Sequence, residues 1–321
     1  MTNVNDTTLK ALRHASQRLN DLPHNDRETA FTLLREAIRQ AEDDRKRLIA
    51  TWCSCPAFSV DPVYMPDDTC PCGERSRKIR VHGEPARIPD VATARDRYRH
   101  PEETLAFFGV RPTDTVVEIW PGGGWYTEIL APYVLRGGGT YYAAAMGANG
   151  HNGVRRMMEA NPALYGGIRF AAFPAFEAAE TRVPDGSADV VLTFRNVHNW
   201  QMGYQRDSQP YAEEAFRQMY AMLRPGGTLG IVDHRLPEAA DAERERSSGY
   251  IKVSTVRRLA EAAGFRFVAS SEVNANPRDT ADWPQGVWTL PPALRLGDED
   301  RERYLAIGES DRMTLRFVKP L

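Results

Sequence analysis

The hydrophobic positions of the chain follow two different periods from residue 91 onward. Short apolar runs predict buried strands over residues 116–120, 140–145, 168–173, 189–194 and 228–233. A spacing close to 3.6 residues predicts helices over residues 126–134, 212–223 and 255–263. A further strand is predicted over 265–271, and the alternating segment 312–318 can close the sheet as an antiparallel C-terminal strand. Strands that alternate with helices indicate a Rossmann-like, doubly wound, mainly parallel α/β sheet that is covered on both faces.

The first 90 residues follow another pattern and predict a separate module. Residues 6–52 predict two helices, and residues 53–90 are rich in Pro, Cys and Asp with little periodicity. We therefore expect two domains. A small helical hairpin with a cysteine cluster covers residues 1–90, and the α/β domain covers residues 91–321.

The composition is that of a globular protein, because 42% of the residues are hydrophobic and 26% are charged. Lys and Arg number 41 against 43 Asp and Glu, a net charge of -2. A nucleic-acid binder would show a strong basic excess. No apolar run approaches the ~20 residues that span a bilayer, and the N-terminus lacks the order of a signal peptide. We therefore expect a cytoplasmic protein with neither a membrane nor a nucleic acid as its partner.

The cysteines form two Cys-x-Cys pairs in one short segment, at Cys53, Cys55, Cys70 and Cys72. Four thiolates can hold a zinc ion in tetrahedral geometry, although the common spacing is Cys-x-x-Cys. We favour a structural zinc site. A disulfide or redox role and unligated thiols are the alternatives.

A glycine-rich loop follows the first predicted strand, in the sequence Glu118-Ile-Trp-Pro-Gly-Gly-Gly-Trp-Tyr-Thr-Glu128. Ligands of open α/β sheets bind at the carboxyl ends of the strands, and glycines let the backbone approach them closely. The loop departs from the dinucleotide pattern G-x-G-x-x-G, since Thr127 occupies the third glycine position. Glu118 precedes the glycines, which suits a nucleoside ligand without a pyrophosphate.

With this loop the chain resembles the class I S-adenosylmethionine-dependent methyltransferases. It is most similar to a family of predicted methyltransferases that carries the same loop, together with Arg-Asn-Val-His-Asn-Trp after the fourth strand and Leu-Arg-Pro-Gly-Gly before the fifth. The resemblance covers roughly residues 91–320. It implies S-adenosylmethionine as cofactor, bound by Glu118, Trp120, Pro121, Gly122, Gly123, Gly124, Tyr126, Arg195 and Asn196.

The chain departs from the general class I pattern at the next strand. An acidic residue usually ends the second strand and holds the ribose hydroxyls, but here that strand ends in Ala145-Met146. This departure motivates a second hypothesis, a binding or regulatory protein that uses the same fold without transferring a methyl group.

Three residues beyond the strand ends are candidates for chemistry. His198 follows the fourth strand and is the first candidate for a general base. His234 follows the fifth strand, and Tyr250 lies in a predicted lid segment. A local structural role, such as capping a loop, is the alternative for these residues. Arg195 and Arg312 can bind a substrate carboxylate, or they can pair with an acid such as Glu309 or Asp311.

The sequence thus predicts an enzyme that transfers a methyl group to a small-molecule acceptor. A third hypothesis is a methyltransferase directed to protein or RNA, recruited through residues 1–90. The sequence does not indicate the oligomeric state.

Overall fold

In the computed structural model, which describes residues 95–321, eight strands form one mixed sheet. The strands are β1 (Thr115–Ile119), β2 (Thr140–Ala145), β3 (Arg169–Ala172), β4 (Ala188–Phe194), β5 (Leu223–Leu236), β6 (Ile251–Lys252), β7 (Arg266–Ser271) and β8 (Arg312–Val318). Their order is β3-β2-β1-β4-β5-β8-β7, with β6 beside β5. The first five strands are mutually parallel, and β8 is antiparallel to both of its neighbours.

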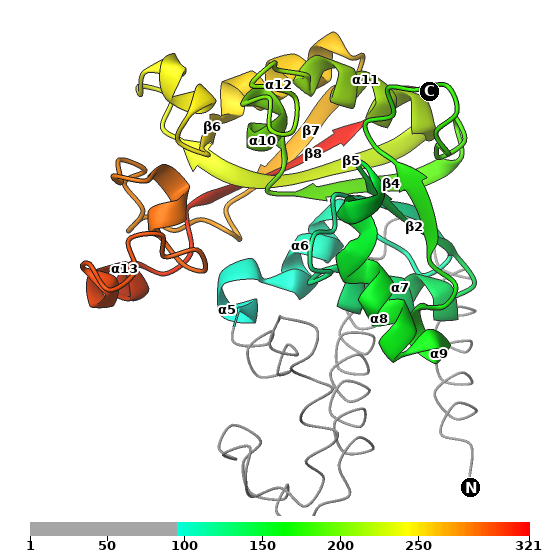
Figure 1. The fold of residues 1–321 in the computed structure, drawn as a ribbon. Coiled ribbons are helices and arrows are strands. Elements are labelled where there is room, and N and C mark those ends of the chain that lie inside the picture. The colour runs from blue at the N-terminus through cyan, green and yellow to red at the C-terminus, as the bar shows by residue number, and fades with distance from the viewer. Residues whose placement is uncertain (1–94) are drawn as a thin grey trace, which may run out of the picture.

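Helices cover both faces of this sheet (Figure 1). On one face lie α6 (Pro101–Phe108), α7 (Thr127–Arg136), α8 (Asn152–Ala160) and α9 (Pro162–Tyr165). On the other lie α10 (Val197–Gln201), α11 (Ala212–Met222) and α12 (Val253–Ala262). The remaining elements are the helices α5 (Asp96–Arg99) and α13 (Arg301–Ile307) and the 3-10 turns η2 (Ala148–His151), η3 (Ala242–Arg246) and η4 (Gly286–Thr289).

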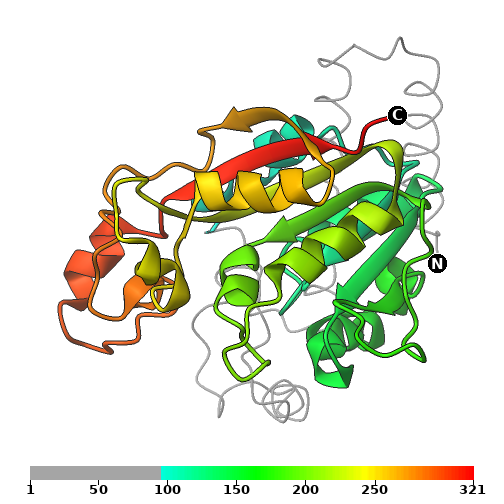
Figure 2. The ribbon, with the colours of Figure 1, turned by 90° about the horizontal axis from the view of Figure 1, so that it is seen from above.

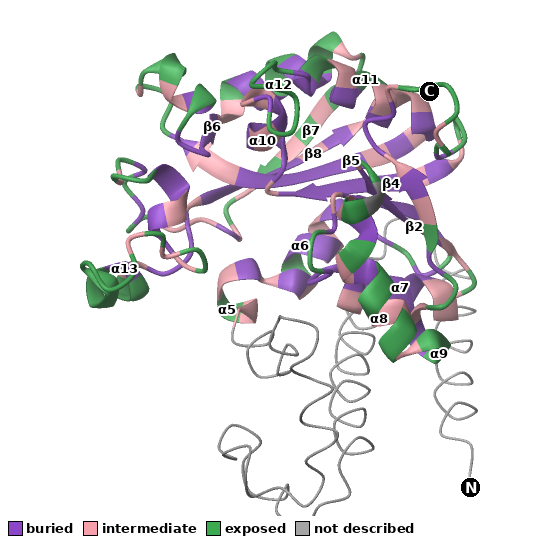
Figure 3. Cartoon of the chain, viewed as in Figure 1, coloured by how far each residue is buried: buried purple, intermediate pink, exposed green. Residues whose placement is uncertain are grey.

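The apolar runs of the central strands form these two layers because each strand is buried on both of its faces. One core lies between the sheet and α10, α11 and α12, and it contains Trp200, Phe216 and Leu259. The other lies beneath α6, α7 and α8 and contains Leu105 and Leu130. Figure 3 shows the buried strands between helices whose outer sides are exposed. The doubly wound sheet predicted from the sequence is therefore confirmed.

The antiparallel C-terminal strand predicted from the sequence is confirmed, and the structure adds its place in the sheet. β8 is antiparallel as expected, but it lies between β5 and β7, so β7 forms the edge of the sheet (Figure 2). The burial patterns give the reason. Met313, Leu315 and Phe317 of β8 are buried, whereas exposed and half-buried residues alternate along β7, which is typical of an edge strand.

The insertion of β8 has a consequence for the site. Because β8 runs against β5, its first residue, Arg312, lies opposite His234 near the end of β5. The segment before β8 thus reaches the edge where β4 and β5 end. Residues far apart in the sequence meet at this edge.

Two further findings concern the rest of the chain. No helix among residues 95–321 combines the length and the apolar character that crossing a bilayer requires. The predicted helices of residues 6–52 and the cysteine cluster lie outside the described residues.

Candidate functional site

The glycine-rich loop between β1 and α7 lies at the carboxyl end of the parallel strands. Its backbone enters the left-handed region three times, with φ of 52° at Trp120, 58° at Gly122 and 86° at Gly124. Glycine adopts this region freely, but a tryptophan there is uncommon. Gly122 and Gly123 are exposed, so their backbone is accessible to a ligand. Bulky residues with such backbone angles concentrate at functional sites.

Trp120 joins this loop to the opposite helical layer. Its indole Nε1 donates a hydrogen bond to the Phe173 carbonyl over 2.8 Å. The ring meets Trp200 and Tyr204 edge-on, with centroids 6.1 and 6.3 Å away. Trp120 is half-buried. These contacts fix the indole at the side of the site formed by α10.

Pro121 and Tyr126 stabilise the conformation of the loop. The Pro121 carbonyl accepts a hydrogen bond from the Gly124 amide, which closes the turn. The Tyr126 ring is buried and stacks on Phe194 with centroids 3.6 Å apart. Its hydroxyl donates to the Arg99 carbonyl over 3.2 Å, so the loop is tied to the chain that precedes β1.

Helix α8 packs directly on the loop. A methyl group added at Gly153 would lie 2.2 Å from the Gly122 carbonyl oxygen and 2.9 Å from the Gly123 Cα. A methyl group at Gly124 would lie 2.2 Å from the Met157 sulfur. The two glycines therefore permit a close contact that supports the loop from one side.

Glu118 lies beneath the loop and is 2% exposed. Thr127 Oγ1 donates a hydrogen bond to its Oε2 over 2.6 Å, and the Tyr141 hydroxyl donates to the same oxygen. Burial raises the pKa of Glu118 to about 7, although both hydrogen bonds favour the charged form. The carboxyl group thus anchors the start of α7 to β2 from below.

Arg195 and Asn196 form the corresponding turn after β4, next to β1 in the sheet. The Asn196 side-chain amide donates to the Ile119 carbonyl over 3.0 Å and to Thr193 Oγ1 over 3.1 Å. It therefore holds the turns after β1 and β4 together. Arg195 has a φ of 65°, which is again unusual for a residue with a long side chain.

His198, near the start of α10, and Asp233 of β5 form a buried pair. His198 Nδ1 lies 2.7 Å from Asp233 Oδ1, and the two side chains are 4% and 0% exposed. Asp233 also accepts hydrogen bonds from the backbone amides of His198 and His234, over 3.1 and 2.8 Å. A carboxylate at Nδ1 fixes the tautomer that leaves Nε2 free to accept a proton. Within residues 95–321, nothing forms a hydrogen bond to that Nε2.

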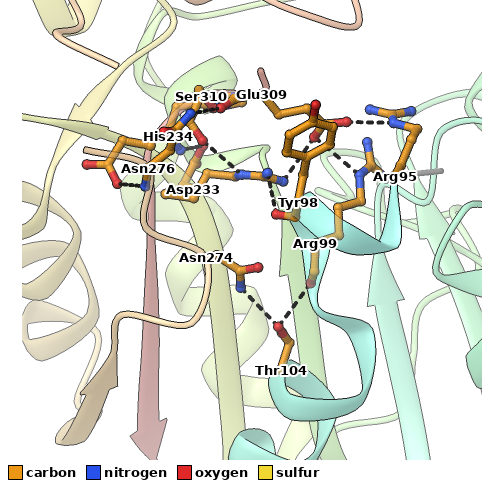
Figure 4. A network of polar contacts seen from close by, with 12 residues as sticks. Arg95, Tyr98, Arg99, Thr104, Asp233, His234, Asn274, Asn276, Glu309 and Ser310 are labelled. Atoms are coloured by element: carbon orange, nitrogen blue, oxygen red, sulfur yellow. Dashed lines mark hydrogen bonds and ion pairs between the residues drawn. The ribbon is translucent and has the colours of Figure 1, made fainter. Parts of the chain in front are cut away.

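His234 faces His198, with ring centroids 5.0 Å apart. Its Nδ1 forms a hydrogen bond with the Ser310 hydroxyl (Figure 4). Burial, His198 and the neighbouring arginines hold the pKa of His234 well below its ordinary value, so the ring is neutral at pH 7. The structure thus brings together the two histidines that the sequence singled out.

Tyr250 lies behind His234, with centroids 6.1 Å apart. The side chain is fully buried, and its hydroxyl donates to both oxygens of Asp279 over 3.0 Å. Burial and Asp279 hold the pKa of Tyr250 above its ordinary value. Because its hydroxyl is held by Asp279, Tyr250 packs against His234 and offers no free hydroxyl group to the site.

Arginine side chains gather around Glu309, on the side of the site where His234 and Ser310 lie (Figure 4). Arg95 Nε donates to Glu309 Oε1 over 2.6 Å, while Arg99 Nε and Arg312 Nη1 lie 3.4 and 3.2 Å from Oε2. Burial would raise the pKa of Glu309, but Arg312, Arg99, Arg95 and Arg195 outweigh it and lower the pKa to about 2. Glu309 is therefore charged at every physiological pH.

The cluster has more donors than acceptors. Arg99 is 1% exposed, yet its Nη1 and Nη2 atoms have no hydrogen-bond partner among residues 95–321, and neither has Arg95 Nη2. The Arg99 guanidinium lies 4.5 Å from the ring centroid of Trp125, a residue of the glycine-rich loop. Buried polar groups are normally satisfied. Within the described residues, these donors are left to pair with an anionic group.

Sequence reasoning missed Arg95, Arg99 and Asp233 as site residues and treated Glu309 only as a structural partner. The signal for Asp233 was present, because it stands directly before His234 at a strand end. Arg95 directly precedes α5 and Arg99 ends it, in a segment before the first strand where the sequence favours a solvated surface. The four cysteines of the predicted zinc site lie outside the described residues, and the zinc site stays a prediction.

Comparison with solved structures defines the class of fold. A candidate sarcosine dimethylglycine methyltransferase from Galdieria sulphuraria matches with a TM-score of 0.50 at 14% identity, over 73% of this chain and 87% of its own. A methyltransferase dependent on S-adenosylmethionine from Aquifex aeolicus matches with a TM-score of 0.45 at 18% identity, over 62% and 92%. No protein-family profile and no curated protein sequence matches the chain. The described residues thus have the fold of the class I S-adenosylmethionine-dependent methyltransferases, and the narrower family suggested by the loop stays a prediction.

Proposed function

We propose that this protein transfers a methyl group from S-adenosylmethionine to a small molecule, with His198 as the general base. The observation that carries the proposal is the His198–Asp233 pair, which lies at the carboxyl edge of a methyltransferase-like sheet beside the glycine-rich loop. The fold alone does not define the activity, because one fold supports many functions. The proposal of methyl transfer therefore rests on the side chains at the carboxyl edge of the sheet.

The residues present fit the amino-acid end of the cofactor. S-adenosylmethionine carries a carboxylate, and the buried Nη atoms of Arg99, which have no hydrogen-bond partner within residues 95–321, offer a fork of two donors for such a group. The exposed Gly122 and Gly123 would allow a close approach of the ligand to the backbone. Glu118, Trp120, Pro121, Gly124, Tyr126 and Asn196 would hold the loop in shape.

The nucleoside end of the cofactor would be held in another way than usual. β2 ends at Ala145 and is followed by Met146 and Gly147, so no carboxylate stands where the ribose hydroxyls are commonly bound. The fit therefore rests on the loop and on Arg99.

His198 would perform the proton transfer. The bound cofactor supplies an electrophilic methyl group on its sulfonium centre. The acceptor becomes nucleophilic when His198 Nε2 takes its proton, and Asp233 stabilises the resulting imidazolium through Nδ1. His234 stays neutral beside it, so it adds no repelling charge when His198 is protonated.

Variants of the pair test this role. We expect His198→Gln to lower the rate of S-adenosylhomocysteine release about 10²–10⁴-fold, with affinity for S-adenosylhomocysteine unchanged. Asp233→Asn should lower the rate by a smaller factor. The assay screens phenols, amines, thiols and carboxylic acids as acceptors, and Gln201→Ala on the same helix is the control. Full activity of the His198→Gln protein would contradict the proposal.

A binding or regulatory protein on this fold is the second candidate. The missing carboxylate after β2 and the close packing of Gly153 on Gly122 favour it. One experiment distinguishes a methyltransferase from a binding protein. Production of S-adenosylhomocysteine with any acceptor excludes the binding protein, whereas tight cofactor binding without turnover supports it.

A further inference from the structure

We propose that the methyl acceptor is an acidic small molecule whose oxyanion, a carboxylate or a phosphate, binds Arg195 beside His198. This inference rests on the proposed function, because it names the substrate class of the same site. The evidence for it is the distribution of charged side chains at the carboxyl edge of the sheet.

The edge carries an excess of positive charge. Arg95, Arg99 and Arg312 pair with the single buried carboxylate of Glu309. Arg195 interacts electrostatically with Glu309 and with the buried Glu118, and forms an ion pair with neither among the described residues. Asp233 adds one more carboxylate nearby, through its contact with His198. Buried charges are costly unless they are paired. A bound anion would compensate the excess positive charge at this edge of the sheet.

The cofactor itself does not remove this excess. S-adenosylmethionine has one carboxylate but two positive groups, its amino group and its sulfonium centre. Its carboxylate can pair with Arg99, yet its net charge adds to the positive side. Binding of the cofactor therefore adds to the excess positive charge at this edge of the sheet. The methyl acceptor is the remaining component that can supply a compensating negative charge.

Arg195 is the arginine that remains available. Arg312 donates to the Tyr98 carbonyl over 2.6 Å and pairs with Glu309, so it is a structural residue. Arg95 also pairs with Glu309. Arg195 is half-buried, and its guanidinium donates no hydrogen bond to any of residues 95–321. A planar guanidinium with free donors matches carboxylate and phosphate geometry.

The backbone places Arg195 beside the proposed base. Arg195 stands three positions before His198, at the end of β4. Its amide donates to the Val232 carbonyl over 2.6 Å, and its carbonyl accepts from Asn199 Nδ2 over 3.4 Å. A φ of 65° is an unfavourable backbone angle for a residue other than glycine. Such strain is typical of a residue that a site requires in one orientation.

A metal ion is the competing occupant of this edge. His198, Asp233 and His234 offer ligand atoms within 4.8 Å of one another. Two observations favour the anion. The Asp233 carboxylate already accepts hydrogen bonds from His198 and His234, and the surrounding arginines repel a cation.

The test uses the full chain saturated with S-adenosylhomocysteine and titrates it by calorimetry. The probes are benzoate, phenylacetate and inorganic phosphate, with benzamide and phenylacetamide as neutral counterparts. We expect at least one anion to bind and the amides to fail. Arg195→Gln should weaken that anion at least tenfold, Arg195→Lys should restore part of the affinity, and Arg217→Gln, an exposed arginine on α11, should change nothing.

Several outcomes would overturn the inference. Equal binding of acids and amides, or no binding by any anion, would exclude an oxyanion site. A loss of S-adenosylhomocysteine affinity in Arg195→Gln, with 5′-methylthioadenosine affinity unchanged, would assign Arg195 to the cofactor carboxylate. Zinc binding that His198→Gln abolishes would indicate a metal site. If the wild-type protein binds no S-adenosylhomocysteine but still binds an anion through Arg195, the methyltransferase proposal fails and the oxyanion site stands.

Discussion

At the scale of single residues, Glu118 links the site to the stability of the protein. Its carboxyl group is buried at the end of β1, and its pKa in the folded chain is raised to about 7 from 4.5. Between these two values the folded protein holds a proton that the unfolded chain releases. The free energy of unfolding therefore falls as pH rises through this window, by up to about 3 kcal/mol.

We predict that Glu118→Gln removes this pH dependence. The variant should lose less stability than the wild type between about pH 4.5 and pH 7, as measured by urea unfolding at several pH values. Asp114, whose pKa burial raises to about 6, contributes with the same sign in both proteins and cancels in the comparison. Parallel stability curves for the two proteins would contradict the assignment.

The residue scale also shows what the sequence could reveal about the site. The sequence placed His198 and His234 after two strands, at the carboxyl edge of the sheet, and in the structure their rings face each other. The partners that define their environment could not be predicted in the same way. Arg99 meets Glu309 across 210 positions, and no local spacing encodes that contact.

At the scale of elements, we expect the close packing of α8 on the glycine-rich loop to be the contact that an added side-chain atom disturbs most easily. Alanine normally stabilises a helix interior by about 1 kcal/mol relative to glycine. We predict the opposite at Gly153, because the new methyl group would lie 2.2 Å from the Gly122 carbonyl oxygen. Gly153→Ala should lower stability by about 1–3 kcal/mol and weaken S-adenosylhomocysteine binding.

Thermal unfolding and calorimetry measure both effects. Asn152→Ala, at the exposed neighbouring position of the same helix, is the control and should change neither. A stabilised Gly153→Ala protein with wild-type affinity would show that α8 can move away from the loop at no cost.

The elements themselves were largely predictable, because each follows its own periodicity. The predicted strands 140–145 and 312–318 coincide with β2 and β8. The place of β8 between β5 and β7 was not predictable, since the order of strands depends on tertiary packing. That order matters for function, because it brings Glu309 and Ser310 to the histidines.

At the scale of the whole molecule, the charge distribution carries more information than the total charge. The chain has a net charge of -2, which gives no sign of a general attraction for polyanions. Four arginines nevertheless gather at one edge of the sheet around Glu309. Composition cannot reveal such local segregation. The fold creates it by joining the chain before β1, the turn after β4 and the start of β8.

The central claim is that this edge binds S-adenosylmethionine through its carboxylate. Calorimetric titration of the full chain with S-adenosylhomocysteine tests it most directly, with NAD as the parallel ligand. We predict one site of micromolar affinity, about 8 kcal/mol, and no heat from NAD. Arg99→Met should weaken S-adenosylhomocysteine at least tenfold and leave 5′-methylthioadenosine unaffected. Binding of NAD, or no binding of S-adenosylhomocysteine and S-adenosylmethionine by the folded wild-type protein, would contradict the account.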